Sequence, residues 1–211
     1  MNQSIVSGEM TTAAHFRPAT RRWLMCGIAT ALLAVAGCGG SKHASPQDIA
    51  SDAPAGTARH ALLVAEAAAS SWMRDAHLIY LENDGPLAPA GETARWGFLF
   101  RSEMADSWRN VSVEKGRVVR EAPLGFPFAG PDLPADWIDS NAAVARAEEA
   151  GGREFREKNG GELEHAVLGR GVFTAWDGPA TWTVVYRGAD HSELAIVVNA
   201  ADGSIVSRFE G

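Results

Sequence analysis

Cysteine is nearly absent from this sequence. The 211 residues contain two cysteines, Cys26 and Cys38, and none follows position 38. Residues 39–211 therefore form no disulfide with one another, hold no cysteine-based metal site and offer no thiol nucleophile.

A membrane-spanning stretch is lacking as well. The one long apolar run extends from Trp23 to Gly37 and is shorter than the roughly 20 residues that a spanning helix needs. Arg17, Arg21 and Arg22 precede it, and small residues end it. A basic segment, an apolar segment and small residues before a cleavage point are typical of a secretory signal peptide, so residues 1–37 predict export.

The last residues of this signal, Val35-Ala36-Gly37-Cys38, resemble the lipobox of bacterial lipoproteins. The resemblance implies cleavage before Cys38, lipidation of its sulfur and a mature chain held on a membrane. More than one acyl chain gives stable anchoring where one is marginal. With two membranes present, Gly39 after the cysteine is compatible with the outer membrane. An uncleaved anchor, a plain secretory signal and twin-arginine export remain open alternatives.

Positive charge is scarce after the signal. Residues 1–37 hold three arginines and one glutamate, so of the chain's 19 basic and 26 acidic residues, 16 and 25 follow, a net charge of −9. An acidic surface argues against nucleic acid as a partner and against electrostatic attraction to anionic lipid. Attachment to the membrane is therefore assigned to the lipid on Cys38.

Two segments divide the remaining chain by composition. Residues 38–56, which begin with the lipidated cysteine, are rich in Gly, Ser, Ala, Pro and Asp and predict a flexible tether. Residues 122–135 are rich in Pro and Gly and predict a linker. The boundaries leave two folded units, 57–121 and 136–211.

These two units repeat the same pattern. WGFLFR from Trp96 and VSVEKGRVV from Val111 correspond to WTVVYR from Trp182 and IVVNAADGSIV from Ile196. Before each tryptophan, apolar residues at spacings of three and four predict a helix, with Thr57 capping the first and Asp139 or Ser140 the second. Gly151-Gly152 is expected to end or kink the second helix. Trp96 and Trp182 are predicted to be buried in the core.

The second unit resembles a PepSY-type domain. The resemblance rests on WIDSNAAVARAEEAGG from Trp137, WTVVYR and LAIVVNAADGSIV from Leu194; residues 57–121 match only in outline. It implies an α+β fold of two repeated units, each a helix packed on a three-stranded antiparallel sheet. It also implies a non-catalytic module of the cell envelope, of a kind found in protease propeptides and associated with restraining peptidases.

The residues that catalysis would need are not clustered in the sequence. His60, His77, His165 and His191 show no helical metal-ligand spacing, and no Gly-x-Ser-x-Gly elbow or phosphate-binding loop is present. We therefore expect no enzyme, no metal and no cofactor. A small ligand-binding protein or enzyme that uses a cavity between helix and sheet remains an alternative.

Three tryptophans are candidates for partner binding, because tryptophan is enriched at binding hot spots. Trp108, Trp137 and Trp176 lie beside predicted turns or the linker, where they either seal the contact between the units or form an exposed patch. The sequence thus predicts an extracytoplasmic lipoprotein that binds an envelope protein, such as a peptidase, through a sheet edge or face. A structural lipoprotein that scaffolds envelope components is the competing hypothesis.

Overall fold

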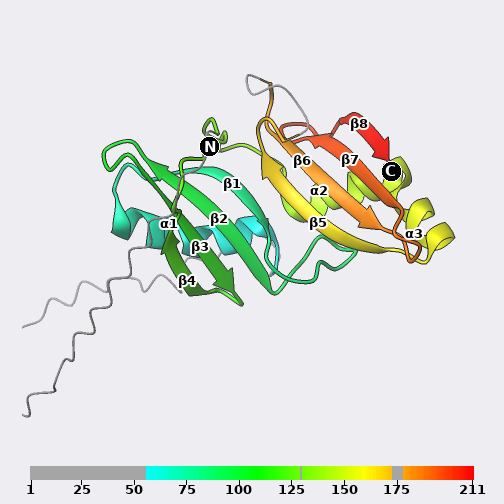
Figure 1. Cartoon of the computed structure of the whole chain (residues 1–211), viewed down its shortest axis with the longest axis horizontal. Helices are drawn as coiled ribbons and strands as arrows, with labels where there is room; N and C mark the ends of the chain where they lie inside the picture. Colours follow the sequence, from blue (N-terminus) through cyan, green and yellow to red (C-terminus); the bar gives the residue numbers. More distant parts are fainter. Residues whose placement is uncertain (1–55, 129, 173–177) are drawn as a thin grey trace, which may run out of the picture. The chain divides into compact units, whose positions relative to one another are not determined.

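The structure is a computed structural model that describes residues 56–128, 130–172 and 178–211, all within one compact unit. The predictions for Cys38, the signal peptide, the tether and Trp176 lie outside the described residues. The fold is α+β, with eight antiparallel strands in a single sheet of order β4-β3-β2-β1-β5-β6-β7-β8 (Figure 1). Within the described ranges, no helix is both long enough and apolar enough to cross a membrane.

The chain enters the sheet through β1 and builds one half of it outward to β4. This half consists of α1 (Ala58–Trp72), β1 (His77–Asn83), β2 (Arg95–Ser102), β3 (Ser107–Glu114) and β4 (Arg117–Pro123). Its helix packs mainly on β2 and β3. Alternation along β2 and β3 explains this, because Trp96, Phe98 and Phe100 face the helix together with Val111 and Val113.

The second half follows the same element order from β5 outward to β8. It consists of α2 (Ser140–Ala147), the π-helical turn η2 (Glu148–Gly152), α3 (Arg153–Asn159), β5 (Glu162–Gly169), β6 (Thr181–Arg187), β7 (Glu193–Asn199) and β8 (Ile205–Glu210). The predicted break at the glycine pair is confirmed, since Gly151 has φ 121° and separates α2 from α3. Only glycine adopts this conformation readily.

The predicted count of three strands in each unit is wrong, and so is the division into two sheets. Each closing segment contains a turn and therefore forms two strands. In the first half the turn is at Lys115 and Gly116, which both have positive φ, as a tight hairpin turn requires. In the second half it lies between β7 and β8. The innermost strands β1 and β5 then pair, so each half contributes four strands to one sheet.

The pairing of β1 with β5 is short, and a side chain extends it. The backbones are paired at Leu81 with Leu168 and at Glu82 with Val167. Beyond this point Asn83 Nδ2 donates to Glu164 O at 3.0 Å, and Asn83 Oδ1 accepts from Ala166 N–H at 2.8 Å. The amide thus replaces the next backbone pair of the ladder.

Both ends of the predicted linker, 122–135, are held to the sheet. β4 continues to Pro123, and Leu124 N–H donates to Trp108 O at 3.0 Å. At the other end Leu133 N–H donates to Leu78 O at 3.0 Å, on the part of β1 that β5 does not pair. In between, the rings of Phe128 and Tyr80 are in contact, with centroids 5.7 Å apart.

Candidate functional site

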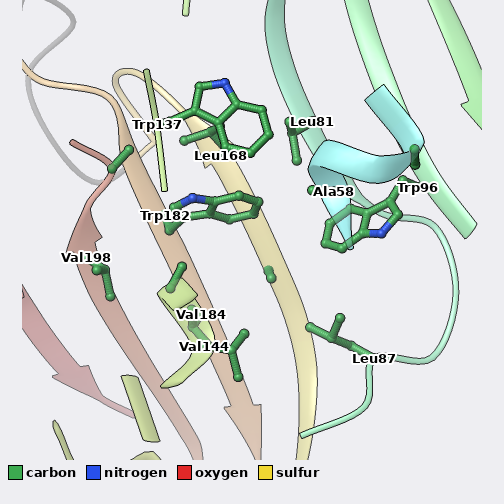
Figure 2. Packing of buried hydrophobic residues seen from close by; sticks show 14 of the residues in the cluster. Ala58, Leu81, Leu87, Trp96, Trp137, Val144, Leu168, Trp182, Val184 and Val198 are labelled. Atoms are coloured by element: carbon green, nitrogen blue, oxygen red, sulfur yellow. The ribbon is translucent and has the colours of Figure 1, made fainter. Parts of the chain in front are cut away.

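The two corresponding tryptophans meet in the core between the halves. Trp96 and Trp182 are 1% and 0% exposed, as predicted, and their rings pack edge to face with centroids 6.3 Å apart (Figure 2). Each indole N–H donates at 2.8 Å to a carbonyl just before a helix, Trp96 to Gly56 and Trp182 to Ile138. The register of the tryptophans in the sequence therefore reflects equivalent positions in the fold.

Trp137, a candidate for partner binding, lies in this core. Its ring is 3% exposed and packs edge to face on Trp182 with centroids 5.8 Å apart (Figure 2). The guanidinium of Arg59 lies over the ring, 4.0 Å from its centroid, and donates to the backbone carbonyl of Trp137. In this position the ring joins the halves and presents no face to a partner.

Trp108, the other described candidate, is half-buried on β3. The guanidinium of Arg101 on β2 lies 5.8 Å from its ring centroid. Its indole nitrogen is buried and makes no hydrogen bond. Trp108 and Trp137 therefore lie on different elements with different exposure, and the structure does not gather them into one patch.

Asp139 and Ser140, at the start of α2, cap both helices. Asp139 Oδ1 accepts from Ser140 N–H at 2.7 Å and from Arg59 N–H of α1 at 3.0 Å. Ser140 Oγ accepts from Ala58 N–H and donates to Gly91 O. A carboxylate between two helix N-termini is favourable, because both present unpaired N–H groups and a partial positive charge. Asp139 and Ser140 thus have structural partners in the two helices.

The buried charges of the second half are also paired. Glu148 binds Arg156 through two hydrogen bonds, of 3.1 and 2.6 Å, beneath the π-helical turn. The phenol of Tyr186 lies beside them, and its burial, together with the Glu148 carboxylate, raises its pKa far above the usual range. Glu148 and Arg156 thus pair with each other across the turn at Gly151-Gly152.

The histidines lie apart from one another. His77 on β1 contacts Asp132 at 2.9 Å, and His165 on β5 is half-exposed with Glu164 at 3.9 Å. His191 occupies a turn with φ 69°, and His60 lies on α1. In the parts of the chain that the structure describes, no three His, Cys, Asp or Glu side chains come together as a metal site would need.

A groove runs between α1 and residues 133–137. It has a volume of about 620 Å³, and its walls include Leu62, Leu63, Leu78 and Leu133. Glu66 lies at its rim, where partial burial raises the pKa of the carboxyl and the charge of Arg59 opposes that rise. Arg59, Ser70 and His77 also line the groove, so a bound small molecule would meet polar as well as apolar groups.

Strand β8 forms an edge of the sheet with exposed apolar side chains. Ile205, Val206 and Phe209 are 44%, 46% and 47% exposed, so three of the seven large apolar side chains exposed among the described residues lie on this strand. No described strand pairs with its outer side. The sequence predicts binding through a sheet edge or face but does not identify this strand, although its apolar residues at 205, 206 and 209 are visible in the sequence.

The hydrogen-bonding pattern shows which backbone groups of β8 point outward. Gly211 and Glu193 of β7 exchange both backbone hydrogen bonds, at 3.0 and 3.1 Å. In an antiparallel ladder such pairs alternate with pairs whose N–H and C=O point away from each other. Given the register, the N–H and C=O of Arg208 and Glu210 therefore point to the open edge.

The opposite edge, β4, differs in chemistry. Its exposed side chains include Arg117, Arg120 and Glu121, with Val119 as its one large exposed apolar residue among those described. Pro123 supplies no N–H. Proline on an edge strand, and charges that a neighbouring strand does not neutralise, oppose pairing with another chain. The two edges of the sheet are thus unequal, and β8 is the one suited to accept a strand.

Comparison with known proteins identifies no family for this chain. No family model matches the chain, and no curated protein matches it. Among solved structures, the chain is similar to a crystal structure from Clostridium difficile 630 described as a putative lipoprotein. The two share 11% identity with a TM-score of 0.46, over 70% of this chain and 90% of the other. A likeness at this level identifies neither a family nor an activity.

Proposed function

We propose that this protein is a lipoprotein, anchored by lipid on Cys38 in the cell envelope, whose folded body is a non-catalytic module that binds an envelope protein. The partner adds a strand to β8. The order of signal, small residues and cysteine supports the anchor. The observation that carries the binding role is the β8 edge, where outward N–H and C=O groups of Arg208 and Glu210 lie beside exposed Ile205 and Val206.

Strand addition needs two kinds of contact, and β8 offers both. Backbone groups on an open edge supply the hydrogen bonds, and side chains that alternate along the strand supply specificity. β4 also has backbone groups on an open edge, but it offers a partner few apolar side chains. The resemblance of residues 136–211 to PepSY-type domains favours a tandem of such units and an envelope peptidase as the partner.

The binding role is tested by removing one outward N–H group from the edge. Proline at position 208 removes an N–H that points outward, so Arg208→Pro leaves the β7–β8 hydrogen bonds in place. Glu121→Pro is the matched control, because the N–H of Glu121 also points outward, on β4. Affinity capture of the lipidated protein from its own membranes should lose the partner with Arg208→Pro and keep it with Glu121→Pro.

The outcomes separate the hypotheses. Equal capture by both proline variants would rule out β8 as the binding strand. Capture of an assembly complex in place of a peptidase, again dependent on β8, would favour a scaffolding lipoprotein. For the anchor, Cys38→Ser should abolish incorporation of labelled fatty acid and release the protein from the membrane. Retention of Cys38→Ser on the membrane would contradict lipid anchoring.

The groove beside α1 supports a second candidate function, the binding of a small molecule that has both apolar and polar groups. Its volume of about 620 Å³ and its leucine walls are the observation that favours it. An environment-sensitive apolar dye should bind there and lose affinity with Leu63→Asp. Dye binding that Leu63→Asp leaves unchanged would rule out this groove.

A further inference from the structure

The charges on β8 are arranged so that the strand is complementary to itself. Arg208 and Glu210 have their side chains on one face of the sheet, where they contact each other within the strand. Phe209 between them has its side chain on the other face, opposite Ala195 in the register with β7. Along the strand, a cation at Arg208 is therefore followed by an aromatic ring at Phe209 and an anion at Glu210.

Two copies of such a strand fit together in one antiparallel register. With a twofold axis at Phe209, Arg208 of each copy lies opposite Glu210 of the other. These are the two residues whose N–H and C=O point outward, so the same register that pairs the charges also pairs the backbones. Opposite charges directly across an antiparallel pair are stabilising, and like charges there are destabilising.

The neighbouring registers are less favourable. An axis at Arg208 places two guanidinium groups opposite each other. An axis at Ser207 places Arg208 opposite Val206, which lies at the irregularity in the β7–β8 register. On β4, Arg120 and Glu121 are adjacent and so project to opposite faces, and that edge has no equivalent pattern. The charge pattern therefore favours β8 over β4, and the register centred on Phe209 over the registers centred on Arg208 and Ser207.

An edge of this length buries little surface by itself. Stable dimers in solution usually bury on the order of 1,200 Å² or more, which a few residues of strand do not supply. Confinement raises the effective concentration of two weakly associating copies. The lipid anchor of the proposed function supplies that confinement, and the inference rests on it.

We infer that the occupant of the β8 edge in the absence of another partner is β8 of a second copy, antiparallel and centred on Phe209. On the membrane the two copies form one continuous sheet. The pairing covers the backbone groups of Arg208 and Glu210, so a heterologous partner has to displace the second copy. This makes self-association a competitor of partner binding at the same edge.

Disulfide trapping at the axis tests the register. In pairs that do not share hydrogen bonds the Cα atoms are about 4.5 Å apart, within the roughly 4.4–6.8 Å that a disulfide spans. The lipidated full-length chain with Phe209→Cys, reconstituted in phosphatidylcholine vesicles and oxidised, should give a covalent dimer. Val206→Cys is the matched control on the same strand, because its copies would lie roughly 20 Å apart. The chain without an added cysteine sets the background.

Charge exchange then tests the complementarity. In the Phe209→Cys background, Arg208→Glu alone and Glu210→Arg alone each place like charges opposite one another at two positions and should reduce the dimer about tenfold. An equimolar mixture of these two variants restores opposite charges on both sides and should restore the dimer, as a heterodimer. Recovery on mixing also shows that both variants are folded.

Three outcomes would overturn the inference. They are no dimer above background with Phe209→Cys, a stronger dimer with Val206→Cys, or no recovery on mixing the charge variants. The proposed function has a separate readout in the proline variants. Partner capture without a dimer refutes the inference alone, and a dimer without partner capture refutes the proposed partner alone.

Discussion

Trp96 and Trp182 meet edge to face at 6.3 Å, and each bonds a carbonyl that precedes a helix of its own half. Through this contact the two halves share one core, to which α1, α2 and both sets of strands contribute. The body therefore presents an eight-stranded sheet with two edges of different chemistry. Several substitutions test how this body is held together.

The first concerns the shared helix cap. Ser140→Ala is expected to lower the free energy of unfolding by about 2 kcal/mol, because Ala58 N–H and Gly91 O would stay buried without a partner. Urea denaturation measures the change. Ser71→Ala removes an exposed hydroxyl that bonds within α1 and should change stability by less than about 0.5 kcal/mol. Equal losses for both variants would show that Ser140 does not bridge the helices.

The second concerns the close approach at the helix break. A Cβ at Gly152 would lie 2.3 Å from the phenol oxygen of Tyr186, a fully buried side chain. Gly152→Ala should therefore destabilise the protein by about 1–3 kcal/mol or more. Gly125→Ala is the control, since a Cβ there meets nothing within 4 Å. A Gly152→Ala protein as stable as the Gly125→Ala protein would contradict the packing described.

The third prediction concerns the pairing of β1 with β5, where the two halves of the sheet meet. Asn83→Ala removes the amide that accepts from Ala166 N–H and donates to Glu164 O, and should cost about 2 kcal/mol. Hydrogen exchange gives a more local readout, because the amide of Ala166 should lose protection while that of Val184, in the middle of β6, keeps it. Unchanged exchange at Ala166 would show that Asn83 does not extend the β1–β5 ladder.

The fourth concerns pH. Met104 N–H and the hydroxyl of Ser102 donate to the Asp75 carboxylate and lower its pKa from the usual 3.8. A carboxyl whose pKa is lower in the folded state stabilises the protein above the pKa of the unfolded chain, and this contribution disappears as pH falls through the folded pKa. The wild type should therefore melt above Asp75→Asn at pH 7, with a gap that narrows below about pH 4. Melting curves over this range measure it, and a gap independent of pH would contradict the assignment.

Local features of the structure were predictable from the sequence. The helix break follows from Gly151-Gly152, and the burial of Trp96 and Trp182 from their shared register within strands. Trp137 has the first of its two predicted roles, at the contact between the halves, but the sequence could not decide between them because Arg59, which covers the ring, is far away in the chain. The pairing of β1 with β5 was not predicted either, because the sequence pattern around Asn83 carries no information about its partner Ala166. The chemistry of β8 is local, but its place at the edge depends on the order of all eight strands.

The central claim is that β8 is the edge through which the anchored protein binds its partner. Site-specific photo-crosslinking in the native membrane tests it most directly, with a photoreactive residue in place of Val206 on β8 or of Val119 on β4. These two valines are similarly exposed, at 46% and 51%. The account predicts a crosslink to an envelope protein from position 206 that Arg208→Pro abolishes, and none from position 119. Crosslinks of equal yield from both positions, or a crosslink at 206 that persists with Arg208→Pro, would contradict it.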